Sequence, residues 1–238
     1  MSNQQGLGLP EVLIALLLAS LITVTLIRHY LSIQQQYHHI QGSLEQGIDL
    51  QLVSDLIRDS ARKAGFTPCM GIEHLIRIDQ RNQQNPLVAI EVGENGLQRL
   101  RMSHMSEHFD MVLEVVGPSE LLIESRQSLR SNQAMMIADC YHAEVQTIRQ
   151  IRQASTGQLI TLTHPLAYTY RPPIYIGAWI EEVYFMQNGG LFYQVRHPEE
   201  LTKVVVSFSA RLENRLLQVR LGLNDNASKI LETMVRNP

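Results

Sequence analysis

The pattern of hydrophobic and polar positions changes twice along the chain, near residue 28 and near residue 65. Residues 12–27 form an almost unbroken apolar run, interrupted only by alanine and hydroxyl side chains. A run of this length predicts a helix that can span a bilayer. We therefore expect residues 9–27 to be membrane-spanning. A cleaved secretory signal peptide and a plain single-pass anchor remain alternative interpretations.

Beyond the apolar run the spacing becomes that of an amphipathic helix, with an apolar residue every three or four positions. The residues of this apolar stripe are Ile33, Tyr37, Ile40, Leu44, Ile48, Leu52 and Leu56. Val53, Ile57 and Ala61 widen the stripe near its end, as expected where a helix packs on a sheet. Gly65 follows two basic residues and is typical of a helix end. The pattern predicts one helix over residues 7–64, whose second half covers one face of a folded domain.

After Gly65 the apolar positions alternate with a period of two, which is typical of half-buried strands. Asn188-Gly189, between two aromatic segments, is a strong signal for a β-hairpin. The expected strands are residues 75–78, 87–92, 98–102, 111–116, 135–138, 144–149, 158–163, 179–187, 191–196, 203–212 and 216–223. The sequence therefore predicts an α+β protein, in which a long N-terminal helix packs on a mainly antiparallel β-sheet domain at residues 65–238.

Composition narrows the possible partners and the compartment. The net charge of −3 does not favour nucleic acid as the main partner, because binding phosphates requires a concentrated basic surface. The chain has two cysteines, Cys69 and Cys140. If the domain folds outside the inner membrane, in an oxidising compartment, a disulfide between them is expected. Two separate buried thiols are the alternative.

Motifs for catalysis or metal binding are absent from the sequence. His104 and His108 have the i, i+4 spacing of metal ligands on a helix, but no HExxH motif accompanies them. The cysteines lack a paired CxxC, and no GxSxG nucleophile motif occurs. We expect no catalytic residue, no metal and no cofactor. Residues 204–206 are three valines that we expect inside a sheet; at an exposed edge they would pair with another subunit.

The segment Gly6-Leu7-Gly8-Leu9-Pro10-Glu11, followed directly by the apolar run, resembles the class III signal of type IV prepilins. At Leu7 and Gly8 the chain departs from the residues usual in that family. The resemblance implies a leader over residues 1–6, cleavage by prepilin peptidase between Gly6 and Leu7, and N-methylation of Leu7. It also implies that Glu11 pairs with the N-terminal amine of a neighbouring subunit.

Three later segments are similar to PilW-type minor pilins: residues 63–66 with Cys69, Asp139-Cys140 with residues 143–145, and residues 186–191 with Tyr193. This resemblance implies a single-pass inner-membrane precursor with a periplasmic domain, which enters the pilus fibre and primes its assembly, supporting twitching motility or adhesion. The implied partners are other minor pilins, major pilin, the peptidase, the assembly platform and the bilayer. A J-type pseudopilin of a type II secretion system and a membrane-anchored periplasmic binding domain are the alternatives.

Overall fold

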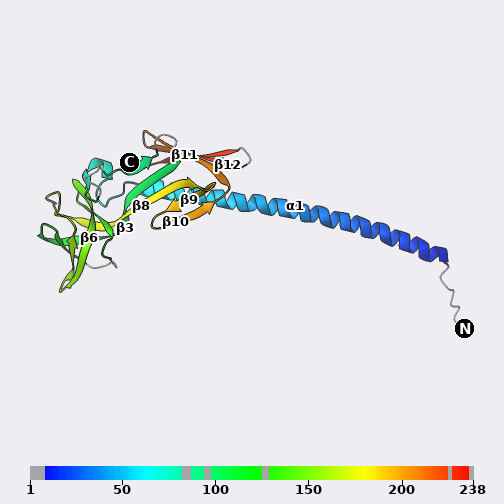
Figure 1. The fold of residues 1–238 in the computed structure, drawn as a ribbon, viewed down its shortest axis with the longest axis horizontal. Helices are drawn as coiled ribbons and strands as arrows, with labels where there is room; N and C mark the ends of the chain where they lie inside the picture. Colours follow the sequence, from blue (N-terminus) through cyan, green and yellow to red (C-terminus); the bar gives the residue numbers. More distant parts are fainter. Residues whose placement is uncertain (1–8, 82–86, 94–97, 125–128, 225–226, 236–238) are drawn as a thin grey trace. The chain divides into compact units, whose positions relative to one another are not determined.

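The computed structural model describes residues 9–81, 87–93, 98–124, 129–224 and 227–235, except the side chains of residues 11, 38, 39 and 43. A single long helix, α1 (Leu9–Lys63), precedes the strands (Figure 1). The chain forms two compact units, Met1–Leu50 and Gln51–Pro238, and the sheets belong to the second. The expected α+β layout, a long N-terminal helix and a large, mainly antiparallel sheet, is therefore confirmed.

Helix α1 ends one residue earlier than the pattern predicts. Gly65 follows it with a positive φ of 71°, a conformation that glycine adopts without steric cost. The N–H of Ala64 donates to the carbonyl of Ser60, and that of Phe66 donates to the carbonyl of Lys63. These bonds satisfy carbonyls of the last turn, as Gly65 turns the chain out of the helix.

The described part of the chain continues with a short 3-10 helix, η1 (Ile72–His74), and with strands of very different lengths. The strands are β1 (Ile76–Asp79), β2 (Ile90–Val92), β3 (Arg99–Gly117), β4 (Glu120–Ile123), β5 (Ala134–Ala138), β6 (His142–Ala154), β7 (Gly157–Leu162), β8 (Tyr175–Gln187), β9 (Gly190–Gln194), β10 (Pro198–Thr202), β11 (Val205–Glu213), β12 (Leu216–Leu223) and β13 (Ser228–Met234).

Six of the strands close into a ring. The larger sheet runs in the order β10-β9-β8-β5-β6-β7-β4-β3-β2, and β3 also pairs with β8. Strand β3 achieves both pairings because it is long: residues 99–111 lie beside β8, and residues 112–117 lie beside β4. All six pairings of the ring are antiparallel. Closure removes the free edges that these strands would otherwise expose.

The interior of the ring is filled with aliphatic side chains, to which every one of its strands contributes. The cluster comprises Val112, Leu121, Ile123, Met135, Ile137, Ile148, Ile160, Leu162, Ile174 and Ile176. Inward-facing residues alternate with outward-facing ones, as a closed barrel requires. The ring is therefore a packed core rather than a container for a ligand. A second cluster, which includes Ile72, Leu75, Met105 and Trp179, lies around the 66–90 segment.

The structure corrects several expected strands. The two strands expected at residues 98–102 and 111–116 are parts of one strand, β3, which begins at Arg99 and whose middle is polar but partly buried. The sequence analysis missed β4, β10 and β13, because they are short, or begin at proline, or carry charged residues. Strand β1 pairs in parallel with β6, whereas the rest of the larger sheet is antiparallel. The Asn188-Gly189 hairpin is confirmed: both residues have positive φ, and β8 and β9 pair across them.

The last three strands form a separate small sheet in the order β11-β12-β13. Phe208, Val219 and Leu231 lie in its buried side. Val205 is buried as expected for the three-valine segment, whereas Val206 is 43% exposed. Strand β11 pairs only with β12 among the described residues, so it is an edge strand of this small sheet.

Candidate functional site

The first candidate site is the apolar part of α1. Within the described residues, α1 is the one helix long and apolar enough to cross a membrane, and none of the apolar window is buried by protein. Leu13, Leu17 and Leu21 are each more than half exposed. Contiguous apolar surface on this scale requires lipid or other protein to cover it. This fits a single-pass membrane protein.

The hydroxyl side chains inside the apolar run donate hydrogen bonds to backbone carbonyls of the same helix. Ser20 donates to the carbonyl of Leu17 at 2.8 Å, and Thr23 donates to the carbonyl of Ala19 at 2.7 Å. Thr25 donates to the carbonyls three and four residues earlier. No hydroxyl of these three residues therefore needs water, which suits a helix in hydrocarbon.

The residues implied by the prepilin resemblance lie at the N-terminal edge of this segment. Gly6 and Leu7 lie outside the described residues, so their expected cleavage and methylation stay predictions. Glu11 belongs to the first turns of α1, where the backbone is helical. Its side chain lies outside the described part, and its pairing role also stays a prediction.

The apolar stripe along the second half of α1 corrects one expectation. Within the unit that holds the sheets, the stripe residue Leu52 is 57% exposed, so this position of the stripe packs on no face of the domain. Burial begins at the next residue, Val53, which has no exposed surface, and Ile57 one turn later has none either. The helix therefore packs on the sheet through Val53 and Ile57, the residues that widen the stripe, and not through Leu52.

The buried end of α1 meets a polar group of the sheet. The hydroxyls of Ser60 and Tyr184 lie 2.7 Å apart, and both residues are buried. Tyr184 stands on β8 beside Tyr193 of β9, whose hydroxyl donates to Glu182 at 3.0 Å. Burial raises the pKa of Tyr184 well above its usual value. The tyrosine therefore stays neutral and serves as a hydrogen-bonding anchor for the helix.

His104 is a buried titratable group that lies on a strand and not on a helix. It lies on β3 and is 3% exposed, so the i, i+4 spacing to His108 does not put the two on one helix face. Burial lowers the pKa of His104, with Glu182, Lys63, Glu107 and Asp59 as the charges around it. No group of three or more metal-ligating side chains occurs among the described residues.

The second candidate site lies around the disulfide. Cys69 and Cys140 are joined, as the sequence predicts, and the bridge spans a sequence separation of 71. It links the segment after α1 to the turn between β5 and β6. The same turn contains Asp139, which is 1% exposed. A covalent link and a buried carboxylate thus hold one short turn.

Two buried carboxylates also hold the long loop between β7 and β8, residues 163–174. Asp139 accepts the N–H of Arg171 at 2.8 Å, and Glu144 accepts the N–H of Ala167 at 2.7 Å. Gln80 and Gln146 donate to Glu144, each at 2.9 Å. Burial opposes ionisation of Asp139, but its bonds from three N–H groups outweigh that and lower its pKa. Burial dominates at Glu144 and raises its pKa.

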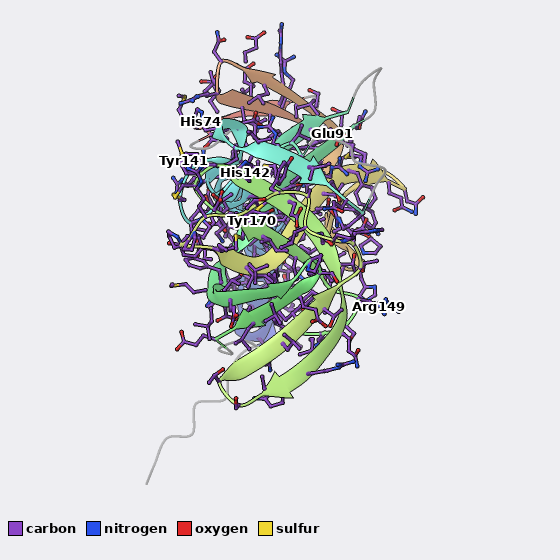
Figure 2. The ribbon with its side chains drawn as sticks, turned by 90° about the vertical axis from the view of Figure 1, so that its left-hand side faces the viewer. His74, Glu91, Tyr141, His142, Arg149 and Tyr170 are labelled. Atoms are coloured by element: carbon purple, nitrogen blue, oxygen red, sulfur yellow. A yellow bond between two sulfur atoms is a disulfide. The ribbon has the colours of Figure 1, made fainter. Side chains whose placement is uncertain are left out.

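The loop and the turn together build what we call the aromatic surface, namely Tyr141, His142, Tyr168, Tyr170 and Arg171. The ring of His142 stacks on that of Tyr168 with centroids 4.8 Å apart. Tyr170 meets both rings edge-on. The guanidinium of Arg171 lies 5.6 Å from the centre of the Tyr141 ring. Figure 2 shows Tyr141, His142 and Tyr170 on one side of the domain.

The sequence analysis missed this surface. Its members come from two segments separated by more than 20 residues, with no recurring spacing. The sequence signals were indirect: Asp139 beside a cysteine, and a loop rich in tyrosine and proline.

No family model, no curated protein and no solved structure matches the chain.

Proposed function

We propose that this chain is a minor pilin that takes part in priming and assembling a type IV pilus. In this proposal the precursor waits in the inner membrane with its sheet domain in the periplasm. Prepilin peptidase removes residues 1–6, and the mature subunit joins other minor pilins. Major pilin then adds beneath this small complex. The work of the protein is assembly, not catalysis.

One observation carries the proposal: the apolar surface of α1 continues well past the length that a bilayer covers. The expected membrane-spanning segment, residues 9–27, is within the length of helix that the hydrocarbon requires. The exposed stripe then goes on through Ile33, Ile48 and Leu52. A plain membrane anchor has no use for apolar side chains beyond the bilayer, where they face water. Helices of neighbouring subunits are a natural cover for both parts of such a helix.

Two further features support the proposal. The signal-like segment from Gly6 to Glu11 stands directly before the apolar run. The disulfide between Cys69 and Cys140 suits a domain that folds in an oxidising compartment. A J-type pseudopilin shares this plan, so the partners that the protein recruits distinguish the two systems.

Processing is the first test. The full chain is expressed with and without prepilin peptidase, and the N-terminus is determined by mass spectrometry. We expect an N-methylated Leu7 in the presence of the peptidase. Gly6→Ala should block cleavage, whereas Gly8→Ala, a matched change beyond the cut, should leave it in place. An intact Met1 on the wild-type chain, despite an active peptidase, would refute the prepilin assignment.

Assembly is the second test. An unpaired carboxylate is costly in lipid, and removing one member of a buried ion pair costs roughly 3–5 kcal/mol. Glu11→Ala should therefore leave membrane insertion intact and weaken co-purification with partner pilins. Glu45→Ala removes a carboxylate from the exposed part of the same helix and is the control. Equal recovery of partners with both variants would remove the pairing role from Glu11.

A further inference from the structure

The aromatic surface is a constructed feature rather than a loose group of side chains. The loop that carries Tyr168, Tyr170 and Arg171 has its backbone bonded to the buried carboxylates of Asp139 and Glu144. Burying ionisable groups is costly, and apolar residues in their place often stabilise a protein equally well. What the two carboxylates add is a defined loop conformation. The disulfide holds the facing turn, so both halves of the surface are preorganised.

The chemistry presented outward is aromatic and cationic. Tyr141 is 56% exposed, and Arg171 beside it is exposed. Asp139, the carboxylate of the turn, is 1% exposed and accepts the N–H groups of Tyr141, His142 and Arg171. Its Oδ1 also lies 3.5 Å from Nδ1 of His142, so it contacts the surface from the buried side and leaves Arg171 as the exposed charge. Ligands for such a surface need a flat apolar face, for contact with rings, and an anionic group for the guanidinium.

We infer that the aromatic surface binds a carbohydrate that carries carboxylate groups. A sugar ring offers a C–H face to an aromatic ring, and its hydroxyls can bond the phenolic group of the exposed Tyr141. The hydroxyl of Tyr170 points inward instead, to the carbonyl of Ile137 at 3.5 Å. A uronate carboxylate matches the planar fork of Arg171. This inference does not depend on whether the chain is a pilin.

Nucleic acid fits this surface less well. A phosphate polymer is bound chiefly through several lysines and arginines. Arg171 is the single permanent cation among the five residues of the aromatic surface, and the net charge of the chain is −3. A sugar acid suits this surface better, because one of its carboxylates can pair with the single guanidinium and its rings can contact the aromatic side chains.

The test uses the full-length protein in detergent and three matched probes: hexagalacturonate, maltohexaose, which has the same linkage type and length without the charge, and hexathymidylate. Affinities are measured by calorimetry at physiological salt. We expect hexagalacturonate to bind best. Tyr141→Ala and Arg171→Ala should each weaken its binding by about fivefold or more, the value of one aromatic or charged contact.

The matched control is Arg149→Ala. Arg149 is exposed on β6 and lies apart from Tyr141 and Tyr170 in Figure 2. Its replacement should leave the affinity for hexagalacturonate unchanged. Circular dichroism should show all three variants folded, because the replaced side chains are exposed. Equal binding of hexathymidylate, or equal loss with Arg149→Ala, would overturn the proposal in favour of unspecific anion binding. Absence of binding to hexagalacturonate would overturn it outright.

Discussion

Removing the disulfide should cost a large part of the stability of the sheet domain. The bridge between Cys69 and Cys140 closes a loop with a sequence separation of 71. In the chain-entropy account, opening a loop of this length gives the unfolded chain more conformational entropy, which lowers its free energy by about 4.4 kcal/mol at 25 °C. Native disulfides in small domains typically contribute about 2–5 kcal/mol. The free energy of unfolding of a domain is typically about 5–15 kcal/mol, so loss of the bridge would remove a large part of it.

The assay is chemical unfolding of the full chain in detergent, followed by the fluorescence of Trp179, the single tryptophan, which lies in the second core cluster. The variant is the double replacement Cys69→Ala and Cys140→Ala, which leaves no free thiol. Reduced wild-type protein is the matched control, because it has lost the bridge but kept both side chains. We expect both to unfold at clearly lower denaturant concentration than the oxidised protein.

The size of the change decides whether this reasoning holds. A loss below about 1 kcal/mol, with an unchanged dependence on denaturant, would show that the unfolded chain gains little freedom when the loop opens. The bridge would then matter for the local turn around Asp139 and not for the domain. A greatly altered dependence on denaturant would instead indicate a change in the unfolded state.

Three other perturbations test the end of α1 and the buried histidine. Ile57→Ala should lower the free energy of unfolding by about 2–5 kcal/mol, whereas Leu52→Ala, at an exposed position, should change it by less than about 0.5 kcal/mol; denaturant titration compares them. Ser60→Ala leaves the hydroxyl of Tyr184 buried without this partner and should cost about 1–3 kcal/mol; adding Tyr184→Phe should recover part of the loss. Burial lowers the pKa of His104, so the unfolded chain takes up its proton first as the pH falls below about 6.5. The free energy of unfolding should therefore fall between pH 7.5 and 5.5, by at most about 1.4 kcal/mol per pH unit, and less steeply in His104→Gln.

The sequence predicts best where one local rule decides the structure. The apolar run, the three-and-four spacing after it and Gly65 place the helix to within one residue of its observed C-terminal end at Lys63. The hairpin at Asn188-Gly189 follows in the same way, because two adjacent residues with positive φ admit few other turns. These features depend on neighbours along the chain, which a sequence displays directly.

The pairing of strands depends on residues that are far apart in the chain. Nothing local in residues 99–117 shows that β3 pairs with β8 along its first part and with β4 along its last. That double pairing is what closes the ring of six strands. Because the middle of β3 is polar and includes the buried Ser103 and His104, the sequence analysis predicted two separate strands there. Burial against other segments overrode the local pattern.

By itself, then, the sequence determined the long apolar helix and the change to strands after Gly65, and it left two possibilities for the two cysteines, of which the structure shows the disulfide. Tertiary structure alone decided which residues at the end of the stripe are buried: Val53 and Ile57 have no exposed surface, whereas Leu52 is 57% exposed. It also assembled the aromatic surface from a turn at 139–142 and a loop at 163–174. Hydrogen bonds from the loop backbone to Asp139 and Glu144 bring these distant segments together, and no periodicity records such contacts.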